Sequence, residues 1–189
     1  FLPNQYKKDS KKKISHNYLR EQFSDYSKIF KEITNVVKKG DYTLGDEVNK
    51  FEKNISKITG AKFAIGVGNG TDALYLSLKA LNIGRNDEVI TTPFAFVGTV
   101  GSIVTAGAKP VFVDIKEDYN INQEKIEKVI TKKTKAIMPI HWSGRPCELK
   151  TISKIAKKYN LKVIQDSCHA IQSKCRNKNL ISYGDIVHI

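Results

Sequence analysis

The stretch IGVGNGTDALYLSLKAL (Ile65–Leu81) joins a β-rich run to an amphipathic run through a turn rich in glycine. The β-rich run covers 63–67, and the apolar residues after the turn recur at helical spacing. Asn69 stands at the junction, where a residue that caps the first turn of a helix is expected. The pattern therefore predicts a strand over 63–67 and a helix over 71–81, which is the unit of a parallel sheet.

The same alternation continues to the end of the chain. Further strands are predicted over 88–91, 110–113, 135–140, 162–165 and 185–189. The helices predicted between them cover 96–106, 123–130 and 148–159. Strands that alternate with helices predict an α/β fold, with a mostly parallel sheet and helices on both of its faces.

The N-terminal part has a different pattern. Two amphipathic helices are predicted over 21–39 and 44–58, each followed by a glycine. Residues 1–16 are polar, rich in lysine and without periodicity, which predicts a flexible basic arm. Because no change of composition marks a linker further on, 17–189 is predicted to form one α/β domain.

The composition is that of an ordinary globular protein. Hydrophobic residues make up 40% and charged residues 27% of the 189 residues. No apolar run approaches the roughly eighteen residues of a membrane span, and no signal peptide is visible, so we expect a cytoplasmic protein without a membrane partner. The three cysteines are predicted to be reduced, and their spacing does not indicate a metal site.

The formal net charge of +13 raises the alternative of a non-enzymatic protein that binds nucleic acid. Most of the excess is lysine spread along predicted helices, and only KKDSKKK (Lys7–Lys13) forms a block. Arginine, which reads bases and phosphates best, occurs only four times. We therefore expect solvated lysine faces whose field attracts a small anionic substrate, and no specific nucleic-acid site.

In parallel sheets, ligands bind at the carboxyl ends of the strands. After the first predicted strand, a helix starts at Gly70, Thr71 and Asp72. Their free N–H groups, the helix dipole and the threonine hydroxyl together make a cradle for one phosphate group. The alternative is a capped turn without a ligand. A dinucleotide site is not indicated, because its G-x-G-x-x-G pattern needs glycine at Thr71.

Two further strand ends carry side chains suited to a flat, cationic ligand. TTPFAFVGT (Thr91–Thr99) places Phe94 and Phe96 near the rim of the sheet, either as core residues or as a face for a planar ring. Asp166 follows a buried strand, where a carboxylate needs a cation unless it caps a helix. His169 lies on the same turn, either facing the same ligand or serving the structure, and the spacing does not match a zinc site.

A phosphate cradle, an aromatic face and a carboxylate for a cationic ring nitrogen are together what pyridoxal 5'-phosphate (PLP) requires. Its phosphate needs an anchor, and its ring needs a flat contact. Its pyridinium nitrogen needs an acidic partner to keep its proton. The sequence therefore predicts a PLP site at this edge of the sheet.

Seven motifs follow one another from about Gly40 to the last residue. They are GDYTLGDEVNKFE, GNGTDAL, GRNDEVITTPFAFVGT, AGAKPVFVDI, TKAIMPIHWSGRP, VIQDSCHAI and YGDI. In this order they resemble the DegT/StrS family of PLP-dependent nucleotide-sugar aminotransferases. The resemblance implies the large domain of the aspartate aminotransferase (type I) fold. It also implies an enzyme that transfers an amino group, from glutamate, to a keto-sugar on a nucleotide.

The resemblance implies roles for individual residues as well. Thr71 and Asp72 match the phosphate-binding positions at the helix start, and Phe96 matches the aromatic that stacks on the cofactor ring. Asp166 matches the carboxylate that pairs with the pyridine nitrogen. His169 occupies the position that approaches the phenolic oxygen of the cofactor.

The Schiff-base lysine of this family lies shortly after the GDI motif, whereas this sequence ends at Ile189. The resemblance therefore implies an incomplete large domain, without the lysine and without the C-terminal small domain, and it assigns no catalytic residue in this numbering. It implies a homodimer for the complete protein, with an amino-acid donor and a nucleotide sugar as substrates. A PLP-dependent sugar dehydratase, in which histidine replaces the lysine, is the nearest alternative.

Overall fold

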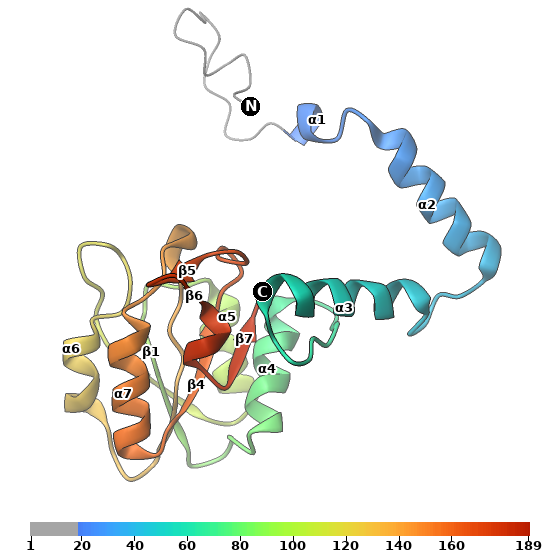
Figure 1. The fold of residues 1–189 in the computed structure, drawn as a ribbon. Coiled ribbons are helices and arrows are strands. Elements are labelled where there is room, and N and C mark those ends of the chain that lie inside the picture. Colours follow the sequence, from blue (N-terminus) through green and yellow to red (C-terminus); the bar gives the residue numbers. More distant parts are fainter. Residues whose placement is uncertain (1–18) are drawn as a thin grey trace, which may run out of the picture. The chain divides into compact units, whose positions relative to one another are not determined.

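The computed structural model of the chain describes residues 19–189. They belong to two compact units, one that ends at Lys50 and one that covers Phe51–Ile189 (Figure 1). The predicted arm over 1–16, and with it the boundary at residue 17, lies outside the described residues. Within residues 19–189, no helix combines the length and the apolar character that crossing a membrane requires. All the residues predicted to form the site lie in the second unit.

The first unit contains α1 (Leu19–Gln22), α2 (Tyr26–Lys39) and the start of α3 (Asp46–Thr59). The helix predicted over 21–39 is therefore interrupted. Asp25 stands directly before α2 with a non-helical backbone (φ −96°, ψ 62°), and its carboxylate binds Lys28 in the first turn at 2.7 Å. The predicted helix end is confirmed, since Gly40 has a φ of 68° and its N–H binds two carbonyls of the last turn.

In the second unit, whose residues are all described, five strands form one sheet in the order β2-β1-β3-β4-β7. Their bounds are β1 Glu88–Thr91, β2 Lys109–Phe112, β3 Thr134–Ile137, β4 Lys162–Asp166 and β7 Ile186–His188. Every pair of neighbours is parallel, which confirms the predicted parallel sheet. The chain leaves β1 toward β2 and returns to β3 on the other side of β1. The carboxyl ends of β1 and β3 therefore form a topological switch point.

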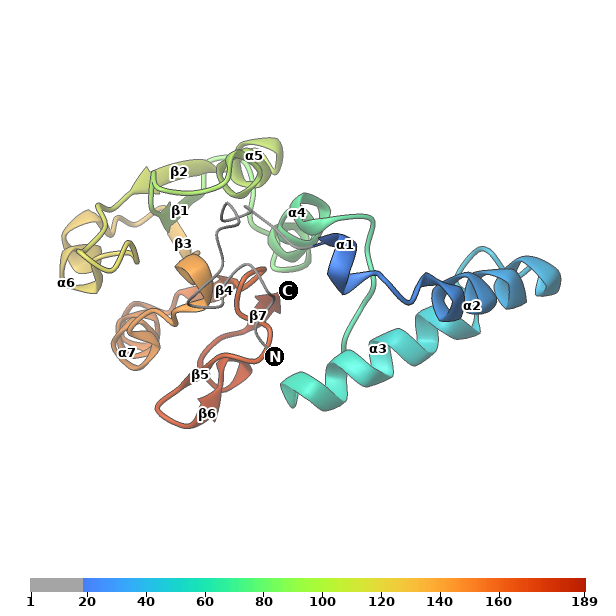
Figure 2. The same ribbon diagram turned by 90° about the horizontal axis from the view of Figure 1, so that it is seen from above.

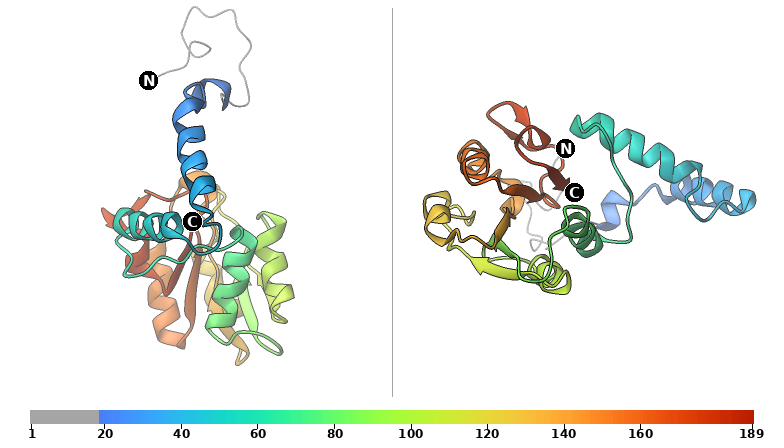
Figure 3. Two further views of the ribbon diagram at one scale, coloured as in Figure 1. Left: turned by 90° about the vertical axis from the view of Figure 1, so that its right-hand side faces the viewer. Right: turned by 90° about the horizontal axis from the view of Figure 1, so that it is seen from below.

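Helices cover both faces of this sheet, as the sequence predicts. The helices α4 (Gly70–Ala80) and α5 (Val97–Thr105) lie on one face, and α6 (Gln123–Ile126) and α7 (Leu149–Tyr159) lie on the other (Figures 2 and 3). Successive strand residues point to opposite faces: Val89 and Ile164 pack with α4 and α5, whereas Ile90 and Val163 pack with α6 and α7. The sheet thus separates two apolar cores.

Several short elements were not predicted. The helix expected over 123–130 ends early and continues as a 3-10 helix at Glu127–Val129. The hairpin of β5 (Lys174–Cys175) and β6 (Lys178–Asn179), and the 3-10 helices Trp142–Gly144 and Leu180–Tyr183, are additional. The hairpin turn uses Arg176 and Asn177, with φ of 50° and 63°, where glycine is the usual signal. Without that signal, the sequence pattern does not reveal the turn.

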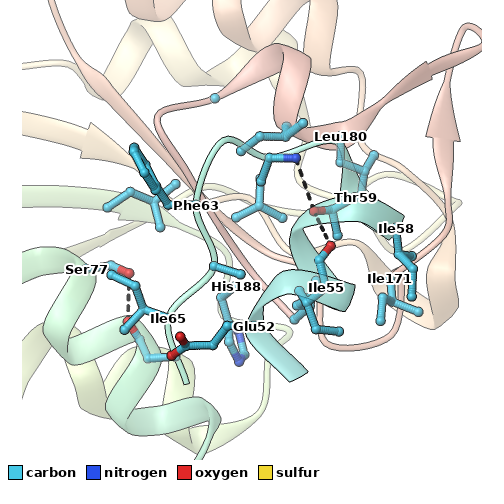
Figure 4. Close-up of a pocket in the computed structure, with 18 of the residues that line it drawn as sticks. Glu52, Ile55, Ile58, Thr59, Phe63, Ile65, Ser77, Ile171, Leu180 and His188 are labelled. Carbon is cyan, nitrogen blue, oxygen red and sulfur yellow. Dashed lines mark hydrogen bonds between the residues drawn. The ribbon is translucent and has the colours of Figure 1, made fainter. Parts of the chain in front are cut away.

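The strand predicted over 63–67 is wrong, because these residues form no strand. Phe63 is 74% and Ile65 is 81% exposed. β propensity reflects packing against neighbouring strands, and this segment has no strand beside it in the second unit. A groove of about 1280 Å³ is lined by this segment, by the end of α3 and by β7, the last strand of the sheet (Figure 4).

A matched pair of substitutions tests this arrangement. Ile137→Ala removes a fully buried side chain of β3, so we expect a loss of about 2–5 kcal/mol in the free energy of unfolding. Ile65→Ala removes the same atoms from an exposed position and is expected to cost less than about 0.5 kcal/mol. Urea denaturation of both variants measures the difference. Equal losses would show that Ile65 is packed in the protein.

Candidate functional site

Asp166 is a buried carboxylate at the carboxyl end of β4, with 4% of its surface exposed. The Thr99 hydroxyl donates to Oδ2 at 2.7 Å. Nδ1 of His188 lies 3.3 Å from Oδ1, and the N–H of Cys168 donates to the same oxygen at 3.5 Å. No helix follows Asp166, so it is not a helix cap, which was the alternative role.

These donors keep Asp166 ionised. Burial alone raises the pKa of its carboxyl group, but the hydrogen bonds from His188, Thr99 and Cys168 outweigh burial and lower the pKa to about 2. A carboxylate offers about four lone-pair directions, and three donors occupy this one. Within residues 19–189, Asp166 is thus a fixed anion with three donors, and by this count it has capacity for one more hydrogen bond.

The start of α4 is capped as the sequence predicts. The Asn69 side chain accepts a hydrogen bond from the N–H of Asp72 at 2.9 Å and donates to its carboxylate at 2.9 Å. The expectation of three free N–H groups is therefore wrong for Asp72, because the cap uses that donor. Within the described residues, the N–H groups of Gly70 and Thr71 have no acceptor, so they remain available to an anion.

Phe96 and Thr71 meet beside Gly98, at the starts of α5 and α4. A Cβ atom on Gly98 would lie 2.5 Å from the Thr71 hydroxyl oxygen and 2.7 Å from Cε1 of the Phe96 ring. Only glycine leaves both side chains in place. Phe96 is 69% exposed, and its carbonyl accepts the N–H of Thr99 at 3.0 Å. An aromatic face, a threonine hydroxyl and the buried carboxylate are thus joined through α5.

His169 contacts a second group of side chains. Its exposed ring meets the Trp142 ring edge-on at a centroid distance of 6.1 Å. Trp142 in turn packs on Phe94 at 4.4 Å, and Phe94 stacks on Tyr119 at 5.4 Å. Phe94 follows β1 and Trp142 follows β3, so this aromatic cluster marks the switch point of the sheet. The role of His169 toward a cofactor stays a prediction.

His141, to which the sequence assigned no role, ties two strand ends together. Its Nδ1 accepts the N–H of Cys147 at 3.1 Å, and its Nε2 donates to the Gln165 side chain at 2.9 Å. Burial lowers the pKa of His141, against the opposing effects of Gln165 and Asp166, so the ring is neutral at pH 7. This buried, fully bonded histidine supports the backbone around Asp166.

Thr99 and His188, two side chains that bind Asp166, were not among the predicted site residues. A signal for His188 was present, because it ends the last strand as Asp166 ends β4, and the two are directly paired in the sheet. Thr99 closes the quoted TTPFAFVGT stretch one turn after Phe96. Ser167, the next residue, carries a buried hydroxyl without a partner among the described residues.

The profile of the DegT/DnrJ/EryC1/StrS aminotransferase family matches residues 24–188, and the chain belongs to this family. A dTDP-3-amino-3,6-dideoxy-alpha-D-galactopyranose transaminase of Aneurinibacillus thermoaerophilus is 43% identical over 169 residues, which are 88% of this chain and 47% of the relative. A UDP-2-acetamido-2-deoxy-3-oxo-D-glucuronate aminotransferase of Pseudomonas aeruginosa is 40% identical over 147 residues, 77% of this chain and 41% of the relative.

Solved structures agree with this assignment. The structure of NtdA from Bacillus subtilis with bound cofactor PMP superimposes with a TM-score of 0.85 at 32% identity, over 94% of this chain and 41% of that one. DesV of S. venezuelae superimposes with a TM-score of 0.84 at 29% identity, over 86% and 44%. The chain spans less than half the length of these relatives. Its α/β fold is that of the PLP-dependent aminotransferases, which confirms the predicted fold class and family.

The ionisation of Asp166 predicts how stability depends on pH. Because the folded-state pKa of about 2 lies below the ordinary 3.8, this group stabilises the fold above pH 4 and loses that contribution as the pH falls toward 2. The shift corresponds to about 2 kcal/mol. Asp166→Asn should therefore be less stable than the parent at pH 7, with a difference that shrinks on acidification, as urea denaturation at pH 7, 5 and 3 would measure. Glu117→Gln, at an exposed carboxylate, is the control. If the difference in unfolding free energy between Asp166→Asn and the parent does not change with pH, the assignment is contradicted.

Proposed function

We propose that the protein is a PLP-dependent aminotransferase that moves an amino group from an amino-acid donor, glutamate, to a keto-sugar on a nucleotide. The observation that carries the proposal is the buried, ionised Asp166, which has one acceptor direction left at the carboxyl end of a parallel sheet. Family membership supports the reaction class.

The residues around Asp166 fit PLP in charge and shape. The N–H groups of Gly70 and Thr71, together with the Thr71 hydroxyl, suit its phosphate at the positive end of α4. The exposed ring of Phe96 offers a flat face to its aromatic ring. Asp166 suits its ring nitrogen. These groups come from the start of α4, the start of α5 and the end of β4. The hydrogen bond from Thr99 to Asp166 links α5 to β4, and the absence of a side chain at Gly98 lets Thr71 and Phe96 come together.

When bound, PLP supplies an electron sink for the carbon that exchanges the amino group. The residues of this chain serve to keep that electron sink effective. Asp166 would hold the proton on the ring nitrogen of a bound cofactor, because an anion beside a pyridinium raises its proton affinity. Thr99 fixes the carboxylate from the side of α5, so the charge stays aimed in one direction.

The substrate class rests on the relatives and on the charge. Two relatives are named for the transamination of a dTDP-sugar and of a UDP-sugar. A net charge of +13 favours the approach of a nucleotide diphosphate. We also propose a cytoplasmic homodimer for the complete enzyme. The dehydratase alternative differs in the residue that stands in place of the covalently bound lysine, so trapping of a PLP adduct on lysine with borohydride separates the two.

Asp166→Asn tests the ring-nitrogen contact in the purified enzyme. The neutral amide keeps the shape but removes the anion, so the Kd for PLP should rise roughly 10- to 150-fold, the value of a hydrogen bond to a charged group. Fluorescence titration with PLP measures this, and the transfer of the amino group from glutamate is followed in parallel. PLP affinity and turnover equal to those of the parent would rule out the assignment.

Thr71→Val tests the phosphate contact, because valine preserves the shape and removes the hydroxyl. The affinity for PLP should fall by about 0.5–3 kcal/mol but not vanish, since the N–H donors at the helix start remain. Thr105→Val, at the exposed end of α5, makes the same chemical change away from the site. If Thr71→Val and Thr105→Val bind PLP equally well, Thr71 serves only the helix start.

A further inference from the structure

His188 lies between the two ends of the candidate site. On one side, its Nδ1 is 3.3 Å from Oδ1 of Asp166. On the other side, Nε2 and Cε1 of the ring lie 2.8 and 3.0 Å from the position that a Cβ atom on Gly70 would occupy. The side chain is buried in the wall of the groove beside β7 (Figure 4). One ring therefore touches both the carboxylate and the start of α4.

The two neighbours decide where the ring carries its proton. Asp166 is ionised and can only accept a hydrogen bond, so Nδ1 must be the donor. Nε2 faces the first residue of α4, where free N–H groups carry partial positive charge. An imidazole with its proton on Nδ1 and a lone pair on Nε2 suits both sides.

Gly70 provides the space for this arrangement. An alanine Cβ at 2.8 Å from Nε2 is closer than side-chain atoms approach one another, so the imidazole would have to move. The ring belongs to the last residue of β7, whose backbone is paired with β4, and it has little freedom to move as a whole. Rotation away from Gly70 would lengthen the contact of 3.3 Å with Asp166.

We propose that His188 is a positioning residue, which orients the Asp166 carboxylate through Nδ1–H and couples it to the helix start at Gly70. The effect on the cofactor rests on the proposed function, whereas the coupling itself concerns only residues of this chain. Glycine at position 70 is then required for the histidine and not only for a phosphate. In this proposal His188 acts through Asp166.

The first test reads the proton without any cofactor. Long-range ¹H–¹⁵N correlation spectra of the purified protein at pH 7 distinguish protonated from unprotonated ring nitrogens of His188. We expect Nδ1 to be protonated in the parent, and this signature to be lost in Asp166→Ala, which removes the acceptor, and in Gly70→Ala. Gly101→Ala is the matched control, because a Cβ there meets nothing within 4 Å, and it should leave the spectrum unchanged. A parent ring protonated only at Nε2, or an unchanged spectrum in Gly70→Ala, would overturn the proposal.

The second test is a double-mutant cycle on PLP affinity. His188→Ala and Gly70→Ala should each weaken PLP binding roughly tenfold, and the double variant should bind no more weakly than His188→Ala, because the clash has been removed. His188→Asn, whose amide nitrogen can donate from nearly the same position as Nδ1, should restore much of the affinity. Strictly additive losses, or no recovery with asparagine, would reject the positioning role.

The two tests also separate this inference from the proposed function. If the spectra change as expected while Asp166→Asn binds PLP like the parent, the coupling holds and the cofactor assignment fails. If Asp166→Asn loses PLP while His188→Ala does not, the cofactor assignment holds and the positioning role is rejected.

Discussion

The buried charge of Asp166 is the constraint on which the arrangement of the second unit depends. An isolated carboxylate at this depth costs several kcal/mol, and it persists only because donors reach it from separate elements. Thr99 brings α5 to the end of β4, and His188 brings β7. Phe96 stands at the start of α5, and His188 of β7 lies next to Gly70. The stability requirement of one anion thus gathers the aromatic face and the helix start into a single site.

Local patterns were sufficient for most of the fold. The apolar runs that become β1, β3 and β4 alternate between two cores, and the Asn69 cap depends on a contact three residues away. Local patterns alone do not pair Asp166 with Thr99 and His188, because these two side chains lie 67 and 22 positions away in the sequence. Pairing at such separations depends on the order of strands in the sheet, which no local period encodes. The buried strand before Asp166 indicated this carboxylate, and the family resemblance gave it a role, but neither indicated the side chains that keep it ionised.

The failed strand prediction has a similar origin. The residues over 63–67 have the composition of a strand, but a strand needs a partner as well as a composition. His141 is a different case, in which the residue type alone does not reveal the role. A histidine near a predicted site suggests chemistry, yet the structure gives it two hydrogen bonds to neighbouring strand ends and a neutral ring. Burial decides between these roles.

Within residues 19–189 no strand pairs with the outer side of β7, and this edge and the exposed segment beside it affect how copies of the chain behave toward one another. An unpaired edge presents N–H and C=O groups to any extended polypeptide, and Phe63 and Ile65 add apolar surface next to it. Such an edge is the kind of surface at which sheets add to one another. The charge of +13 opposes such addition by repulsion between like copies, and that repulsion weakens as salt screens it. The colloidal stability of the chain thus depends on two opposing effects, attraction between sheet edges and repulsion between like charges, and salt weakens the second.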